Sequence, residues 1–173
     1  MVKTLFYGTD LDGRLFDPIA DLLKSFGGPE RIINIKRFLD RLRYKNANIK
    51  LVSTSWAPVT EKQWQEYLIN VTNTFDLGFK NNDVLSLEDP GPGIRADYGE
   101  AIRRDMEYFD LGFNEALFAG DGIDNIKSAK GVCNTLLLPK NVGLDQTDCA
   151  YIEALVSHFQ QEVRQYQFLD EAP

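Results

Sequence analysis

The chain has 173 residues, of which 43% are hydrophobic and 12% aromatic, so it can bury an ordinary core, and disorder over most of its length is excluded. Its formal net charge of −7 argues against a broad, sequence-independent nucleic-acid-binding surface, because such a surface needs a cationic protein. The single histidine, His158, excludes a zinc site built from several histidines.

Short apolar runs alternate with longer runs of helical periodicity along the chain. We expect strands over residues 3–10, 48–55, 83–87, 115–121 and 132–138. We expect helices over residues 29–46, 57–75, 96–109, 125–131 and 146–168, and a frayed tail over 168–173.

Capping residues mark several helix ends. Thr60 is the expected N-cap of the helix over 57–75, and Gly131 ends the short helix before the last strand. Thr147 or Asp148 is expected to open the last helix. The alternation of strands and helices predicts one α/β domain over residues 1–173. Its architecture would be a Rossmann-like three-layer sandwich, with a mostly parallel sheet, helices on both faces and little or no cap.

Three of the expected strands end in compact polar sequences: "TDLDG" at residues 9–13, "STSW" at 53–56 and "AGDGIDN" at 119–125. A parallel sheet brings such ends to one edge, which is where ligands bind in open α/β sheets. Carboxylates packed together repel one another unless a cation joins them. The oxygen ligands available here favour Mg²⁺.

These motifs resemble the signatures of the haloacid dehalogenase superfamily. "FYGTDLDGRLF" is similar to the first signature, an apolar strand followed by Asp-x-Asp-Gly. "IKLVSTSW" is similar to the second, a strand that ends in Ser or Thr, and "ALFAGDGIDNIKSAKGV" resembles the fourth. The motifs occur in the family's order within residues 1–138, and each follows an expected strand.

The resemblance implies roles for the residues of the first and fourth signatures. Asp10 would be the nucleophile that forms an aspartyl-phosphate, and Asp12 would be the general acid and base. Gly13 would let the backbone turn beneath the phosphate. Mg²⁺ would be held by Asp10, Asp12, Asp121 and Asn125, with Asp12 contributing its backbone carbonyl.

The chain departs from the family pattern at two of these places. Position 14 is Arg where the family usually has Thr, and Arg14 could bind the substrate phosphate or point to solvent. The fourth signature reads Asp124-Asn125 where many members have the reverse order, so we expect Asn125 on the metal and Asp124 behind it.

The second and third signatures leave alternatives open. Thr54 fits the hydroxyl position of the second signature best, and Ser55 is the second choice; either would contact the phosphate. The lysine of the third signature has no clear match. Arg95 stands at the right place in the chain, and Lys80 is the alternative cation.

The resemblance implies a Mg²⁺-dependent phosphomonoesterase. The intervals between signatures leave no room for a sizeable cap, which favours a macromolecular or exposed phosphate: a phosphorylated protein, a nucleic-acid end or a small molecule. A catalytically silent binding module and a receiver-type signalling domain are the alternatives. No apolar run has the length of a membrane span, so we expect a cytoplasmic protein without a membrane partner.

Overall fold

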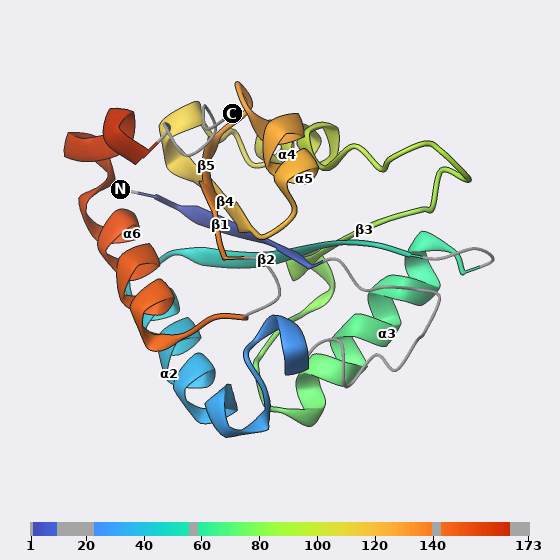
Figure 1. Ribbon diagram of the computed structural model, residues 1–173, viewed down its shortest axis with the longest axis horizontal. Coiled ribbons are helices and arrows are strands. Elements are labelled where there is room, and N and C mark those ends of the chain that lie inside the picture. The colour runs from blue at the N-terminus through green and yellow to red at the C-terminus, as the bar shows by residue number, and fades with distance from the viewer. Residues whose placement is uncertain (1, 10–22, 56–58, 140–142, 167–173) are drawn as a thin grey trace.

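The computed structural model describes residues 2–9, 23–55, 59–139 and 143–166 (Figure 1). Within them, five parallel strands form one sheet in the order β3-β2-β1-β4-β5. The strands are β1 (Thr4–Thr9), β2 (Asn48–Thr54), β3 (Val84–Leu87), β4 (Ala116–Gly120) and β5 (Asn134–Leu137). The helices are α2 (Ile32–Tyr44), α3 (Glu61–Thr74), α4 (Tyr98–Tyr108), α5 (Ile123–Ala129) and α6 (Gln146–Tyr166). The predicted parallel α/β sheet is confirmed.

Helices cover both faces of the sheet, because the strand residues are apolar on both sides (Figure 1). On one face, Leu5, Ile49 and Leu51 pack with α2 and α6, while Trp64 and Leu68 of α3 pack on Val84. On the other face, Phe6, Val52 and Phe118 pack with α4 and α5. The result is the predicted three-layer sandwich. No helix of the described residues has the length and apolar character needed to cross a membrane.

The strand order tests the alternative of a receiver-type domain. The chain leaves the sheet from β3 at one edge and re-enters beside β1 as β4, so the topological switch point lies between β1 and β4. A receiver-type domain has the order 2-1-3-4-5 instead. The alternative of a receiver domain is therefore wrong. The carboxyl ends of β1 and β4 are the expected place for a ligand.

A buried ion pair joins β2 to α4. The Nζ atom of Lys50 lies 2.7 and 2.8 Å from the two carboxylate oxygens of Asp105, and the two side chains are only 4% and 11% exposed. The same ammonium lies 3.9 Å from the centroid of the Phe109 ring. Because the charges neutralise each other away from water, this pair fixes α4 over the sheet.

The helix ends confirm one capping prediction and correct another. Thr60 caps α3 through a capping box, since its hydroxyl accepts from the backbone N–H of Gln63 and the Gln63 side chain accepts from the Thr60 N–H. The last helix starts at Gln146, the first residue of its expected range, but its capping residue differs from the prediction. Asp145 is its N-cap, because it exchanges backbone-to-carboxylate hydrogen bonds with Asp148. The prediction of Thr147 or Asp148 as the opening residue was wrong.

Candidate active site

An open cavity of about 840 Å³ lies at the carboxyl ends of the strands. It is bounded by the ends of β2, β4 and β5, by the start of α4 and by the loop that opens α5. Its described lining residues are Thr54, Arg95, Ala96, Tyr98, Asp121, Gly122, Ile123, Asp124, Asn125, Leu137, Leu138 and Pro139. Four of the residues predicted from sequence, Thr54, Arg95, Asp121 and Asn125, therefore lie around one cavity.

Only the strand residues of the first signature, up to Thr9, are described. Asp10, Asp12, Gly13 and Arg14 lie outside the described residues. Thr9, the last residue of β1, is described and directly precedes Asp10 in the chain. β1 is paired with both β2 and β4, so its carboxyl end lies between Thr54 and the loop that carries Asp121.

Arg95 and Asp124 form an ion pair across the mouth of the cavity. Arg95 precedes α4 and Asp124 lies in the first turn of α5, and their side chains are 76% and 47% exposed. An exposed ion pair contributes little to stability, so a competing anion can replace Asp124 at low cost. Arg95 is accordingly available to a phosphate that enters the cavity.

Thr54 donates a hydrogen bond to the hydroxyl of Tyr98, at 3.2 Å. Tyr98 is buried and donates in turn to the backbone carbonyl of Thr9, over a longer distance of 3.4 Å. The hydroxyl of Tyr98 thus joins the ends of β1 and β2. Sequence reasoning missed this residue, and its place in the first turn of the helix after Arg95 was the one signal for it.

Ser55, the second choice for the phosphate-binding hydroxyl, is buried and does not line the cavity. Its hydroxyl donates to the carbonyl of Val59 at 3.1 Å, and its backbone N–H donates to the carbonyl of Leu87 at 2.6 Å. The first bond links Ser55 to Val59 ahead of α3, and the second extends the pairing of β2 with β3, so Ser55 has a local structural role. Of the two candidate hydroxyls, Thr54 is the one at the cavity.

Lys80, the alternative cation, lies at the amino ends of the strands, on the side of the sheet opposite the cavity. It directly precedes the 3-10 helix Asn81–Asp83, and β3 starts immediately afterwards at Val84. In a parallel sheet, the residues before a strand lie at the edge opposite the carboxyl ends. Lys80 is therefore not brought to the cavity, whereas Arg95 is.

A close contact between α4 and α5 holds the two sides of the cavity together. A Cβ atom at Gly99 would lie 1.9 Å from the carbonyl oxygen of Ser128, so only glycine permits this approach. The backbone N–H of Gly99 donates to the Ser128 hydroxyl at 3.0 Å, and that hydroxyl donates to the carbonyl of Asn125 at 2.8 Å. The helix that follows Arg95 is thereby held against the helix that carries Asn125.

The cavity offers oxygen donors suited to a hard divalent cation. Asp121 contributes a carboxylate and Asn125 an amide oxygen, and oxygen ligands are those that Mg²⁺ prefers. Among the described residues, no group of three or more acidic, histidine or cysteine side chains gathers to hold a metal. The donor set fits Mg²⁺ in its chemistry, and the set predicted from sequence also includes Asp10 and Asp12, which lie outside the described residues.

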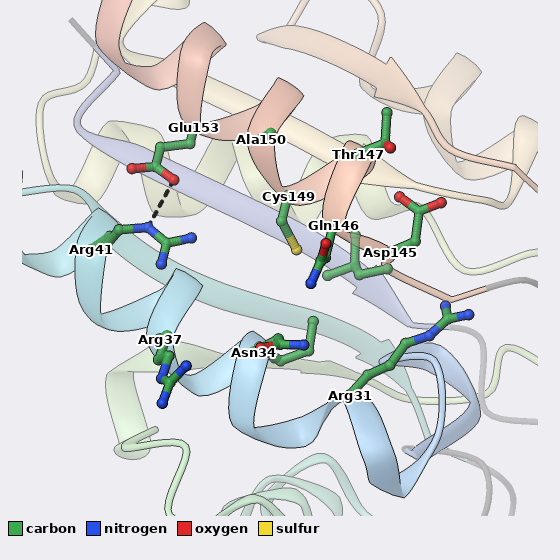
Figure 2. A pocket seen from close by; sticks show the side chains of 12 residues that line it. Arg31, Asn34, Arg37, Arg41, Asp145, Gln146, Thr147, Cys149, Ala150 and Glu153 are labelled. Carbon is green, nitrogen blue, oxygen red and sulfur yellow. Dashed lines mark hydrogen bonds and ion pairs between the residues drawn. The ribbon is translucent and has the colours of Figure 1, made fainter.

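A second cavity, of about 600 Å³, lies between α2 and α6 and shares no described lining residue with the first (Figure 2). Arg41 donates to the carboxylate of Glu153 at its wall, at 2.9 Å. Burial, followed by the nearby charge of Asp148, raises the pKa of the Cys149 thiol to about 12. This thiol therefore stays protonated at neutral pH. None of the described residues predicted for the site lines this second cavity, so the strand-end cavity is the candidate active site.

Comparison with known proteins gives a likeness in structure only. No family model matches the sequence, and no curated protein matches it. The D,D-heptose 1,7-bisphosphate phosphatase from B. bronchiseptica, solved with magnesium and phosphate, aligns with 99% of this chain and 100% of its own, at a TM-score of 0.53 and 13% identity. An uncharacterized protein from Corynebacterium glutamicum aligns with 92% of this chain and 96% of its own, at a TM-score of 0.51 and 15% identity. Identities this low establish a shared fold.

Proposed function

We propose that this chain, which has a haloacid dehalogenase-like fold, is a Mg²⁺-dependent phosphomonoesterase that works through an aspartyl-phosphate. The observation that carries the proposal is the strand-end cavity, where Thr54, Arg95, Asp121 and Asn125 meet beside the end of β1. The fold resembles that of a phosphatase solved with magnesium and phosphate, which supports the same chemistry here.

The two carboxylates after β1 would divide the chemical work. The Asp10 carboxylate attacks phosphorus, and the bond from phosphorus to the leaving oxygen breaks as the aspartyl-phosphate forms. Asp12 gives its proton to the leaving oxygen. It then takes a proton from the water that attacks phosphorus and frees Asp10 and inorganic phosphate. Close spacing of two carboxyl groups favours one ionised and one protonated partner, which this division requires.

Thr54 and Arg95 would hold the phosphoryl group. The Thr54 hydroxyl now donates to Tyr98, so it has to turn its proton toward a phosphoryl oxygen when substrate binds. Arg95 would leave Asp124 and donate to two phosphoryl oxygens at once. Both contacts neutralise charge that builds up on the phosphoryl oxygens in the transition state.

Asp10, Asp12, Asp121 and Asn125 are the residues that would hold Mg²⁺. When bound, the ion would offset the repulsion between the Asp10 carboxylate and the anionic substrate. Asp121 would contribute its carboxylate from the end of β4, and Asn125 its amide oxygen from α5.

The substrate would carry an exposed phosphate, on a protein, a nucleic-acid end or a small molecule, because the cavity is open. Both cysteines, Cys133 and Cys149, are free and buried, which suits a reducing compartment such as the cytoplasm.

Hydrolysis of p-nitrophenyl phosphate, with Mg²⁺ or with excess EDTA, tests the proposal. We expect turnover with Mg²⁺, none with EDTA, and none from Asp10→Asn, which keeps the shape of the side chain but removes the nucleophile. A folded Asp10→Asn protein that still hydrolyses the ester would show that Asp10 is not the attacking group. A folded wild-type protein without Mg²⁺-dependent turnover on any phosphate ester would favour the silent binding module.

A further inference from the structure

A third cavity, of about 710 Å³, runs along the outer edge of β3. α3 and α4 cover opposite faces of the sheet, and β3 is its edge strand (Figure 1). A cavity lined by residues of all three elements therefore opens at the edge itself. Its described lining residues are Glu61, Lys62, Gln65, residues 84–90, residues 95–97, Glu100, Ala101 and Arg104. The cavity is a groove whose floor is β3, which pairs with β2 on its inner side and with no strand of the described residues on its outer side.

The backbone of β3 leaves hydrogen-bonding groups in this groove. The carbonyl of Leu87 accepts from Ser55 and so faces β2. Alternate residues of a strand direct their backbone groups to opposite sides, so those of Ser86 face outward. No hydrogen bond found among the described residues engages the backbone N–H or C=O of Ser86. The outward carbonyl of Val84 accepts from the side chain of Gln65, at 3.1 Å.

The groove is acidic. Glu61 and Glu88 are exposed at its rim, and neither has a described ion-pair partner. Asp89 and Asp97 add two more carboxylates, whereas the charges of the lining residues Arg104 and Arg95 are balanced by Glu100 and Asp124. Lys62 is the remaining described cation of the lining. An occupant with positive charge is therefore favoured.

The groove is continuous with the candidate active site, because Arg95 and Ala96 line both cavities. The four residues of β3 span about 13 Å at the usual rise of a strand, and they run toward the carboxyl edge where the active site lies. A chain bound along β3 would consequently deliver a side chain near its end to Arg95.

We propose that the free edge of β3 binds an extended, lysine- or arginine-rich peptide segment by strand addition, and that this segment carries the phosphorylated side chain hydrolysed in the strand-end cavity. This rests on the proposed phosphatase function for the reaction and on the edge of β3 for the binding. The outward groups of Ser86 would pair with the peptide backbone. Glu61 and Glu88 would face its basic side chains.

Removal of the outward donor of β3 tests the binding mode. Ser86→Pro eliminates the N–H that would pair with the peptide and keeps every ladder bond to β2, since proline is tolerated on the outer side of an edge strand. Ser86→Ala is the matched control, because it loses the same hydroxyl contact with the Glu61 carbonyl but keeps the N–H. Binding of a fluorescent peptide with a central phosphoserine flanked by lysines is measured on Asp10→Asn protein by anisotropy. We expect Ser86→Pro to weaken binding about tenfold and Ser86→Ala to leave it unchanged.

Charge reversal at the rim is the second test, and it stands even if Ser86→Pro does not fold. Glu88→Lys should weaken binding of the lysine-flanked peptide about fivefold and remove much of its salt dependence. Glu66→Lys, an exposed change on α3 outside the groove, should leave both the binding and its salt dependence unchanged. Turnover of p-nitrophenyl phosphate should be the same in all three groove variants, Ser86→Pro, Ser86→Ala and Glu88→Lys.

The outcomes separate this inference from the proposed function. Peptide binding that depends on Ser86 and Glu88, without turnover of any ester, would support peptide binding at β3 and contradict the proposed phosphatase function. Turnover of the small ester, with equal KM values for lysine-flanked and glutamate-flanked phosphopeptides, would contradict the proposal that a basic peptide binds along β3. Preference for a phosphorylated oligonucleotide over the peptide would overturn it as well.

Discussion

The hydroxyl of Tyr98 accepts a hydrogen bond from Thr54 and donates one to the carbonyl of Thr9, so one side chain of α4 connects the ends of β1 and β2. Thr9 is the residue directly before the proposed nucleophile, Asp10, and Thr54 is the proposed phosphate-binding hydroxyl. The relative position of two reacting groups from separate strands therefore depends on a residue that touches neither phosphorus nor metal in the proposed reaction.

Tyr98→Phe should lower kcat about tenfold while changing KM little, because it loosens the placement of Thr54 and of the β1 end but leaves the charges of the cavity in place. The ring stays in the core, so the free energy of unfolding should fall by only about 1 kcal/mol. Steady-state kinetics and urea unfolding measure the two effects. Tyr108→Phe, at an exposed position of the same helix, is the control. An unchanged kcat in a stable Tyr98→Phe protein would show that Tyr98 has no positioning role.

Arg95→Ala should reduce kcat/KM on the order of a hundredfold, as expected when one donor to the transition-state oxygens is lost. Arg95→Lys should keep a substantial part of the activity, since the charge remains although the paired donors do not. Lys80→Ala is the control, because Lys80 precedes β3 at the opposite edge of the sheet. Loss of activity in Lys80→Ala with normal activity in Arg95→Ala would reverse the assignment.

Asp121→Ala should raise the Mg²⁺ concentration needed for half-maximal activity about tenfold or more, because the variant loses a proposed direct ligand of the ion. Asp124→Ala should leave that concentration nearly unchanged, because Asp124 pairs with Arg95 in this structure. The second variant should instead lower KM for the phosphate ester, since Arg95 no longer has to leave a carboxylate. A Mg²⁺ titration of both variants distinguishes these effects, and equal shifts would mean that both carboxylates bind the metal.

The sequence was sufficient for the strand ends because they depend on local signals. The apolar runs predicted strand ends at residues 10, 55 and 121, and the strands end one residue earlier, at Thr9, Thr54 and Gly120. Parallel pairing then predicted that these ends meet. The same locality made the Thr60 cap predictable, since its partner Gln63 is three residues away.

The contacts that complete the site join residues far apart in the chain. Tyr98 lies 44 positions from Thr54 and 89 from Thr9, and Lys50 lies 55 positions from Asp105. Neither a helical tyrosine nor a lysine within an apolar strand reveals its partner in a single sequence. Lys80 was a candidate because of its place in the chain. The direction of β3 places it at the amino ends of the strands, whereas the cavity lies at their carboxyl ends.

The contact between α2 and α6 should make stability depend on pH through Glu153 (Figure 2). Burial alone would raise the pKa of Glu153, but hydrogen bonds from Arg41 and Lys45 lower it overall from 4.5. A carboxyl group whose pKa is lowered by folding stabilises the folded state above its unfolded pKa, and this contribution is lost as the pH falls through the folded value.

Glu153→Gln should therefore be less stable than the wild type by about 1 kcal/mol at pH 7, and the difference should shrink as the pH falls below about 4.5 and through the lowered folded pKa, where the wild-type carboxylate becomes protonated. Urea unfolding at a series of pH values measures the difference between the two proteins. Glu66→Gln, at an exposed position of α3, should show no such trend. If the gap between Glu153→Gln and the wild type stayed the same from pH 7 down to the lowest pH at which both proteins are folded, the stabilisation would come from packing of the side chain, since a charge effect must disappear once Glu153 is protonated.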